Sequence, residues 1–259
     1  MLGMNPWWLI PPIVAADIAG LFFYGAAYPQ AQIFGATTCR TNSPRKLALT
    51  FDDGPNPAVT PKLLDLLALY NAKASFFLVG RAVRESPFLV KEIATRGHLI
   101  GNHTDTHPNL LFRGPQETRE ELLRCSDAIA QATSALPRWF RPPFGFRSPW
   151  LGPIAQQLHM RTAMWTTIPG DWRAKPPAWL IERMKPITAR AQANLASQKN
   201  ANPSSVARTG DVVCLHDGDY ARPNGNRAAT VAALEYWLPR WRDLGLEFVT
   251  IAEDTESIH

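Results

Sequence analysis

The chain has 259 residues, of which 46% are hydrophobic and 19% are charged, a balance that supplies a full core and excludes a disordered chain. The formal net charge is +5, but lysine and arginine are scattered without interleaved aromatic runs, so nucleic acid is not an expected partner. The three cysteines are widely spaced and form no CxxC pair, which disfavours a disulfide framework and a zinc ribbon.

Residues 1–28 form an apolar N-terminal segment. The run from Trp7 to Tyr28 is long enough for one membrane span and carries aromatic residues near both ends. Asp17 near its middle opposes a span, and the basic start typical of a signal is missing because no lysine or arginine precedes Arg40. We predict an apolar helix that acts as a membrane anchor or signal, which makes the protein membrane-anchored or exported towards the cell envelope. The alternative is a helix packed on the domain.

Residues 29–44 are predicted to be a linker, because Gly35, Asn42 and Pro44 interrupt regular structure there. A catalytic domain is then expected at 45–259, where strands alternate with helices. The strands are expected at 47–53, 74–79, 98–102, 139–141, 161–165, 211–215 and 247–251. The helices are expected at 61–70, 87–95, 115–132, 149–158, 179–197 and 228–244, the first capped by Thr60 and the fifth kinked or broken at Pro186. This alternation predicts an α/β fold with a parallel sheet closed into a barrel.

Polar residues follow the predicted strands at five places in the chain. They are Asp52 with Asp53, His103 with His107, Arg141, Asp171, and His216. In a βα barrel, the positions that follow the strands all lie at one rim, which is where such folds keep their chemistry. We therefore expect these residues to form a single site.

The spacing of two histidines predicts a metal site. His103 and His107 are four residues apart, which brings two imidazoles to one side of a helix or tight turn. One carboxylate of the Asp52-Asp53 pair completes a set of two imidazoles and a carboxylate that suits zinc or another divalent first-row ion. The alternatives are an ordinary surface HxxxH sequence and a pair of turn aspartates.

The remaining polar residues suit acid–base catalysis of a hydrolysis. The second carboxylate of the pair can serve as the base, and His216 can protonate a leaving amine. Arg141 can hold the base in place, and Asp171 can keep His216 protonated. Each has a structural alternative, such as a surface ion pair for Arg141 or a turn residue for Asp171. Phe144 and Trp172 can line a sugar-sized pocket or belong to the core.

Five motifs in this order resemble the polysaccharide deacetylase family, which is the NodB-homology domain or carbohydrate esterase family 4. The motifs are Thr50-Phe51-Asp52-Asp53-Gly54-Pro55, His103-Thr104-Asp105-Thr106-His107, Arg141-Pro142-Pro143-Phe144-Gly145, Asp171-Trp172 and Leu215-His216-Asp217. The resemblance covers about residues 45 to 253. It implies a distorted (β/α) barrel of the NodB-homology type and metal-dependent removal of acetyl groups from N-acetylated sugars in glycan chains.

The resemblance also implies a role for each motif residue. Asp52 is the implied general base and His216 the implied general acid, with Arg141 orienting the base and Asp171 tuning the acid. The implied metal ligands are Asp53, His103 and His107, and the implied ion is Zn²⁺, with Co²⁺ or Ni²⁺ as alternatives. The implied substrate contacts are the backbone N–H of Phe144 in the oxyanion hole, and Trp172 and Leu215 around the acetyl group.

Two alternative functions stay open on the sequence. One is hydrolysis of small cyclic amides or imides, which other members of the superfamily perform, and the other is glycan binding without catalysis. Phe144 departs from the tyrosine that many members have. The stretch 190–208 is longer than usual and is interpreted as a disordered loop or part of a substrate groove. The loop 219–226 is placed to touch substrate.

Overall fold

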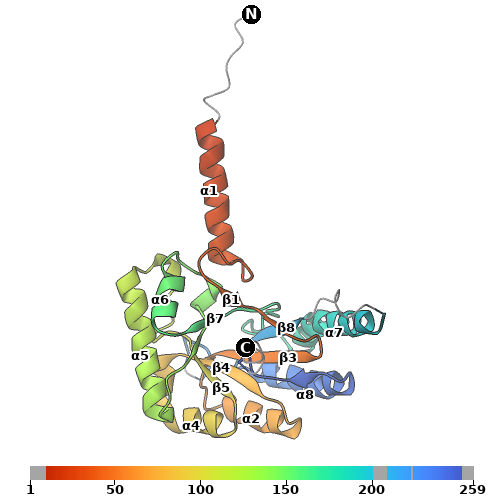
Figure 1. Cartoon of the computed structure of the whole chain (residues 1–259). Helices are drawn as coiled ribbons and strands as arrows, with labels where there is room; N and C mark the ends of the chain where they lie inside the picture. Colours follow the sequence, from red (N-terminus) through yellow and green to blue (C-terminus); the bar gives the residue numbers. More distant parts are fainter. Residues whose placement is uncertain (1–9, 201–208, 223, 253–259) are drawn as a thin grey trace, which may run out of the picture.

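The computed structural model describes residues 10–200, 209–222 and 224–252. Their strands form one nine-stranded sheet that curves into a nearly closed barrel, in the order β1-β7-β6-β5-β4-β3-β8-β2, with β9 paired to β3. Helices pack around the outside of the barrel (Figure 1). The predicted α/β barrel is therefore confirmed.

The elements follow the predicted alternation of strands and helices. The strands are β1 (Thr37–Thr38), β2 (Arg40–Thr41), β3 (Lys46–Gly54), β4 (Ala74–Leu78), β5 (Leu99–Asn102), β6 (Trp139–Phe140), β7 (Arg161–Ala163), β8 (Gly210–His216) and β9 (Glu247–Phe248). The helices are α1 (Ile10–Ala27), α2 (Thr60–Leu69), α3 (Gly80–Glu85), α4 (Pro87–Thr95), α5 (Pro115–Thr133), α6 (Leu151–Gln157), α7 (Pro177–Asn200) and α8 (Ala228–Asp243).

Strand β3 runs through the centre of the sheet and has two buried faces. Leu49 and Phe51 belong to the large hydrophobic core between the sheet and the outer helices, which contains side chains of α2 and α8. Ala48 instead packs in a small cluster with side chains from β4, β6, β7 and β8 that fills the barrel interior. Because strand residues alternate between faces, Thr50 and Asp52 also point into the barrel.

The segment 29–44 does more than connect, because it contributes β1 and β2 to the sheet. Strand β1 pairs with β7 in parallel, and β2 pairs with the start of β8 in antiparallel fashion. The segment after β7 approaches β8 and nearly closes the barrel, because the Thr166 amide donates to the Val212 carbonyl at 2.9 Å and Thr167 forms an isolated bridge with Val213. Strands of two residues are too short to show an alternating pattern in the sequence.

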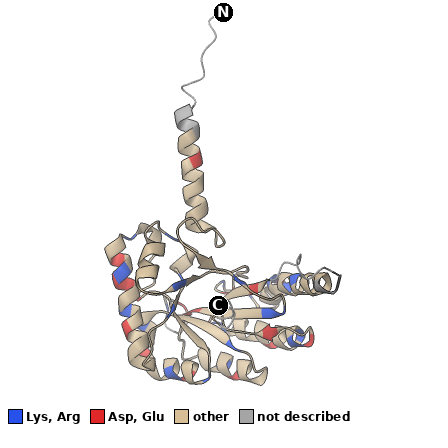
Figure 2. Cartoon of the chain, viewed as in Figure 1, with Lys and Arg blue, Asp and Glu red and all other residues tan. Residues whose placement is uncertain are grey.

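Helix α1 projects away from the barrel (Figure 1). Its last turn is held by Arg147, which is buried and donates to the carbonyls of Ala26 and Ala31 at 2.9 and 2.6 Å. From Val14 to Tyr24 the helix exposes large apolar side chains, and Asp17 is the only charged residue in that stretch (Figure 2). Within the described ranges, no helix has the length and apolarity needed to cross a bilayer. The predicted membrane anchor is therefore not confirmed, and residues 1–9 of that segment lie outside the described part.

Three local predictions are corrected. Helix α7 continues through Pro186, so the predicted break is absent, and residues 190–200 are helical and not a disordered loop, while 201–208 lie outside the described residues. Thr60 does not cap α2 but is its first residue, and its hydroxyl bonds the buried carboxylate of Asp217 instead. Helix α3 was not predicted, because its six residues follow β4 directly without a capping signal.

Candidate active site

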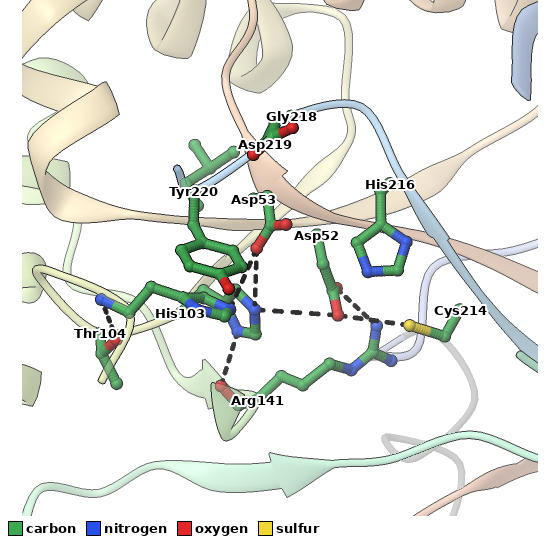
Figure 3. Close-up of polar contacts among 12 residues, drawn as sticks. Asp52, Asp53, His103, Thr104, Arg141, Cys214, His216, Gly218, Asp219 and Tyr220 are labelled. Carbon is green, nitrogen blue, oxygen red and sulfur yellow. Dashed lines mark hydrogen bonds and ion pairs between the residues drawn. The ribbon is translucent and has the colours of Figure 1, made fainter. Parts of the chain in front are cut away.

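Asp52 lies at the end of β3 and is fixed by buried partners on both carboxylate oxygens (Figure 3). Arg141 Nη1 donates to Asp52 Oδ1 and to Thr50 Oγ1, both at 2.7 Å. The Arg141 side chain is wholly buried and stacks 4.2 Å above the ring centre of Phe77. On the other side, Cys214 Sγ donates to Asp52 Oδ2 at 3.3 Å. These contacts hold the carboxylate in one orientation at the barrel mouth.

Asp53 faces the two predicted histidine ligands. It adopts a left-handed backbone conformation with φ of 70°, at the point where the pairing of β3 with β4 shifts register. Its Oδ1 lies 3.5 Å from His103 Nε2 and 3.1 Å from His107 Nε2. The donor atoms of the three residues lie within 4.8 Å of one another. The structure thus brings the three predicted ligands together.

The chemistry of this donor set fits a divalent cation. Burial opposes ionisation of Asp53, but its contacts with His103 and His107 outweigh burial and hold its pKa well below the usual value. Burial lowers the pKa of His107, so a neutral imidazole faces an ionised carboxylate at neutral pH. His103 Nδ1 bonds the Arg141 carbonyl at 2.8 Å, which leaves Nε2 free to ligate. Among the described residues, Asp53 Oδ1 is buried without a hydrogen-bond donor, as expected of an atom reserved for a cation.

His216 lies at the end of β8, beside Asp52. Its Nδ1 bonds Asp171 Oδ1 at 2.8 Å, and its backbone N–H donates to Asp171 Oδ2 at 2.7 Å. Thr230 Oγ1 also donates to Asp171 Oδ2, at 2.9 Å. Burial alone would lower the pKa of His216, but the charge of Asp171 and the hydrogen bond to it raise that pKa to about 9. His216 is therefore protonated at neutral pH, and its Nε2–H is available to the cavity.

A cavity of about 420 Å³ opens above these groups. Its lining includes Asp52, Asp53, His216 and both predicted histidine ligands, together with the large aromatic side chains of Phe144, Trp165, Trp172 and Tyr220. Phe144 has a left-handed backbone with φ of 58°, and its amide forms no hydrogen bond with the described residues. Such an amide is free to bind a negatively charged oxygen.

Leu215 does not line this cavity, contrary to the prediction. It is wholly buried in the core between the sheet and the helices. Strands β3 and β8 are in register, so that Thr50 faces Cys214, Phe51 faces Leu215 and Asp52 faces His216. Because neighbouring strand residues alternate, Leu215 points outwards with Phe51 while Cys214 and His216 point inwards.

Sequence reasoning missed two contacts of the site. Cys214 is buried, and its thiol contacts the carboxylate of Asp52. Tyr220, in a loop expected to touch substrate, stacks on His107 with ring centres 4.0 Å apart. The loop approaches the backbone of Asp53 closely at Gly218, where any side chain would collide with the Asp53 carbonyl.

Comparison with known proteins identifies the chain's relatives. The sequence profile of a family described as Polysaccharide deacetylase matches residues 40–163. A peptidoglycan-N-acetylglucosamine deacetylase of Bacillus cereus is 33% identical over 212 residues, which cover 82% of this chain and 89% of that protein. A chitooligosaccharide deacetylase of a Bradyrhizobium species is 34% identical over 213 residues, which cover 78% and 87% of the two chains.

Solved structures agree with this relationship. The crystal structure of a peptidoglycan N-acetylglucosamine deacetylase superposes with a TM-score of 0.71 and 28% identity, over 85% of this chain and 92% of that one. A CE4 family pseudoenzyme from Bacillus anthracis superposes with a TM-score of 0.67 and 28% identity, over 85% and 68% of the two chains. The chain described above therefore belongs to the polysaccharide deacetylase family.

Proposed function

We propose that the protein hydrolyses the N-acetyl group of N-acetylglucosamine residues in a glycan such as peptidoglycan or a chitin-like oligosaccharide. The observation that carries this proposal is the position of Asp52 and His216. Their donor atoms lie within 4.8 Å of each other, and Asp52 Oδ2 lies 3.9 Å from His103 Nε2 in the neighbouring Asp53–His103–His107 cluster. An amide hydrolase needs a base for water and an acid for the leaving amine on either side of one carbonyl.

The chain's own groups perform the proton transfers in this proposal. Asp52 takes a proton from the attacking water, with its orientation fixed by Arg141. The amide of Phe144 donates to the oxygen that becomes negatively charged as the tetrahedral intermediate forms. His216 donates its Nε2 proton to the sugar nitrogen as the carbon–nitrogen bond breaks, and Asp171 stabilises the imidazolium before that transfer. The products are acetate and a free amino sugar.

Asp53, His103 and His107 would hold the divalent ion that the family's chemistry requires. When bound, such an ion would polarise the acetyl carbonyl and lower the pKa of a water molecule bound to it towards neutral pH. Zn²⁺ is our proposed ion, because two imidazoles, one carboxylate and open positions suit its catalytic sites, and Co²⁺ or Ni²⁺ can occupy the same donor set. Elemental analysis of the protein purified without chelator tests this choice, and an excess of another metal over zinc would contradict it.

The aromatic side chains of the cavity support a sugar substrate. Phe144 and Trp172 are 48% and 42% exposed, although both are large and apolar. Trp172 lies beside His216, with ring centres 5.2 Å apart, so its ring borders the proposed acid. A pyranose ring offers apolar C–H faces that suit such side chains, whereas a small cyclic imide would leave much of this surface in water.

We also propose that α1 associates with a membrane surface, and that the catalytic domain at 45–259 works at the cell envelope. Support comes from the exposed apolar side chains of α1, which include Val14, Ile18, Leu21 and Phe23. Their burial in a lipid interface would remove apolar surface from water. Flotation of the full chain with anionic vesicles tests this, using Ile18→Glu/Phe23→Glu as the control variant. Absence of the wild-type chain from the vesicle fraction would contradict the proposal.

A panel of substrates separates the proposed function from its alternatives. The metal-loaded full chain should release acetate from peptidoglycan or chitooligosaccharides and should leave a cyclic imide intact. Turnover of the cyclic imide alone would favour the small-amide hydrolase. Tight glycan binding without acetate release, with any of the three metals, would favour a binding protein. The presence of a base, an acid and three ligands in one cavity speaks against that last outcome.

A further inference from the structure

The two proposed histidine ligands are held in different ways. A ligating imidazole ordinarily donates its second ring N–H to a carbonyl or carboxylate, which fixes the ring against rotation. His103 follows this rule through its Nδ1 contact with the Arg141 carbonyl at 2.8 Å. His107 does not, because its Nδ1 is buried and has no hydrogen-bond partner within the described part of the chain. Something other than a hydrogen bond must therefore orient its ring.

Aromatic contacts surround His107 instead. The Tyr220 ring lies parallel to the imidazole, with centres 4.0 Å apart and an interplanar angle of 14°. Phe144 meets the same imidazole edge-on at 4.7 Å and meets Tyr220 edge-on at 5.5 Å. Tyr220 comes from the loop after β8 and lines the same cavity as Asp53 and His103 (Figure 3).

The loop that carries Tyr220 is itself pinned at several points. The guanidinium of Arg81 on α3 donates to the Tyr220 carbonyl. Arg227 Nε donates to the Gly218 carbonyl at 2.8 Å, and its Nη2 lies 3.4 Å from the carboxylate of Asp219. The Tyr220 ring is therefore presented by a rigid support, which is what a residue that positions another side chain requires.

We propose that Tyr220 is the positioning residue for His107, and that its stacked ring replaces the missing hydrogen bond in aligning Nε2 with Asp53 Oδ1. This inference rests on the proposed function, because it takes His107 to be a metal ligand. Without the stacked ring, the imidazole can rotate away from the 3.1 Å approach to Asp53. Metal binding would then have to restrict that rotation, which weakens affinity.

Metal affinity, measured without any substrate, tests this proposal. Zn²⁺ is titrated into the chelator-treated full chain in competition with a chromophoric chelator, for wild type, Tyr220→Phe and Tyr220→Leu. Tyr220→Phe keeps the stacked ring and should bind like wild type. Tyr220→Leu keeps apolar volume but not the ring, and should bind about 3- to 10-fold more weakly, the worth of one aromatic pair. Trp172→Leu is the matched control, because Trp172 contacts His216 and no proposed ligand, and its Zn²⁺ affinity should not change.

A spectroscopic measurement separates ligand positioning from general loosening of the loop. The visible spectrum of the Co²⁺-loaded protein should be shared by wild type and Tyr220→Phe and altered in Tyr220→Leu. The metal-free variants should melt within about 4 °C of one another, since Tyr220 is 38% exposed and contributes little to the core. Equal Zn²⁺ affinity of Tyr220→Leu and wild type would overturn the inference. An equal loss of Zn²⁺ affinity in Tyr220→Phe would also overturn it, because the effect would then belong to the hydroxyl group and not to the ring.

The same titration distinguishes this inference from the proposed metal site. Failure of the wild-type chain to bind Zn²⁺ would overturn the site at Asp53, His103 and His107, and the role of Tyr220 with it. Tight binding by wild type together with unchanged binding by Tyr220→Leu would leave the site intact and refute only the positioning role.

Discussion

Replacing Asp171 with asparagine tests the proposed acid most sharply. Asp171 Oδ2 accepts from the His216 backbone N–H and from Thr230, while Oδ1 faces His216 Nδ1 at 2.8 Å. Asparagine can keep the first two bonds with its carbonyl oxygen, which turns its NH₂ group towards Nδ1. Nδ1 must then accept a hydrogen bond rather than donate one. The substitution therefore favours a neutral imidazole without changing the shape of the site.

The magnitude of the effect follows from the pKa of His216. That pKa rises from 6.5 to about 9 because Asp171 outweighs the opposing effect of burial. The difference corresponds to roughly 3 kcal/mol in favour of the imidazolium. Loss of the charge should move the alkaline limb of kcat/KM down by about 2 pH units. The interaction of Asp171 with the His216 imidazolium also contributes to the free energy of unfolding. This contribution is fully present below pH 6.5 and is lost as pH rises through about 9, and Asp171→Asn should lack this pH dependence.

The assay is a pH profile of acetate release by the zinc-loaded enzyme, with a titration of the His216 imidazole by NMR on the same samples. A bound cation repels the imidazolium and lowers the His216 pKa in both proteins, so the comparison is between their two limbs. Asp211→Asn is the control. Asp211 lies on β8, the strand that carries His216, but its carboxylate pairs with Arg190 and not with His216. An unchanged alkaline limb in Asp171→Asn would refute the assignment of His216 as the acid.

Further predictions address the metal, the base and the buried charges. Chelation should abolish acetate release and lower the melting temperature, and added Zn²⁺ should restore both, because Asp53 Oδ1 is otherwise without a donor in the described structure. Asp52→Asn should lose at least about 100-fold in kcat but keep its Zn²⁺ affinity in a chelator competition, whereas Asp53→Asn should lose that affinity. Arg141→Lys should lower the free energy of unfolding in urea by about 3 kcal/mol, since it gives up bonds of a wholly buried guanidinium. Burial raises the pKa of Asp217 to about 7, so ionisation lowers stability as pH rises from 3.8 to about 7. Metal-free Asp217→Asn should therefore melt above wild type near pH 8 and closer to it near pH 5, and equal melting temperatures at both values would contradict this.

The fold and the proposed metal ligands were predictable because their signals are local. Strand β3 shows its alternation at Leu47, Leu49 and Phe51, and its two carboxylates follow near its end. His103 and His107 are four residues apart in a single loop, so no long-range information was needed to pair them. The five motifs fixed the family and the barrel, and the shared rim of a βα barrel then brought the remaining polar residues together.

The contacts that the sequence did not reveal depend on register between distant strands. Cys214 meets Asp52, and Leu215 turns away from the cavity, because β3 and β8 pair with Asp52 opposite His216. If β8 slipped by one residue against β3, Leu215 would point into the barrel and Cys214 would point outwards. Neither strand's sequence, taken alone, determines that register. The position of Tyr220 on His107 likewise depends on a distant contact, because Arg81 on α3 holds the loop that carries Tyr220.

The continuity of α7 through Pro186 has a local explanation that the sequence pattern did not reveal. Proline removes the hydrogen bond to the carbonyl four residues earlier, at Glu182. Both residues are exposed, while Met184 and Ile187 are buried in the core. Water can therefore satisfy the freed carbonyl, and the buried side of the helix keeps its packing.

The central claim is that Asp52 acts as the base of a metal-dependent N-deacetylation. The most direct test measures acetate and free amino groups together, using the zinc-loaded full chain and Asp52→Asn with its bound zinc verified, on peptidoglycan and on chitooligosaccharides. We expect one amine for each acetate released by wild type, and almost no release by the zinc-loaded variant. Equal release by the two proteins, or no release by wild type from either glycan with zinc bound, would contradict it.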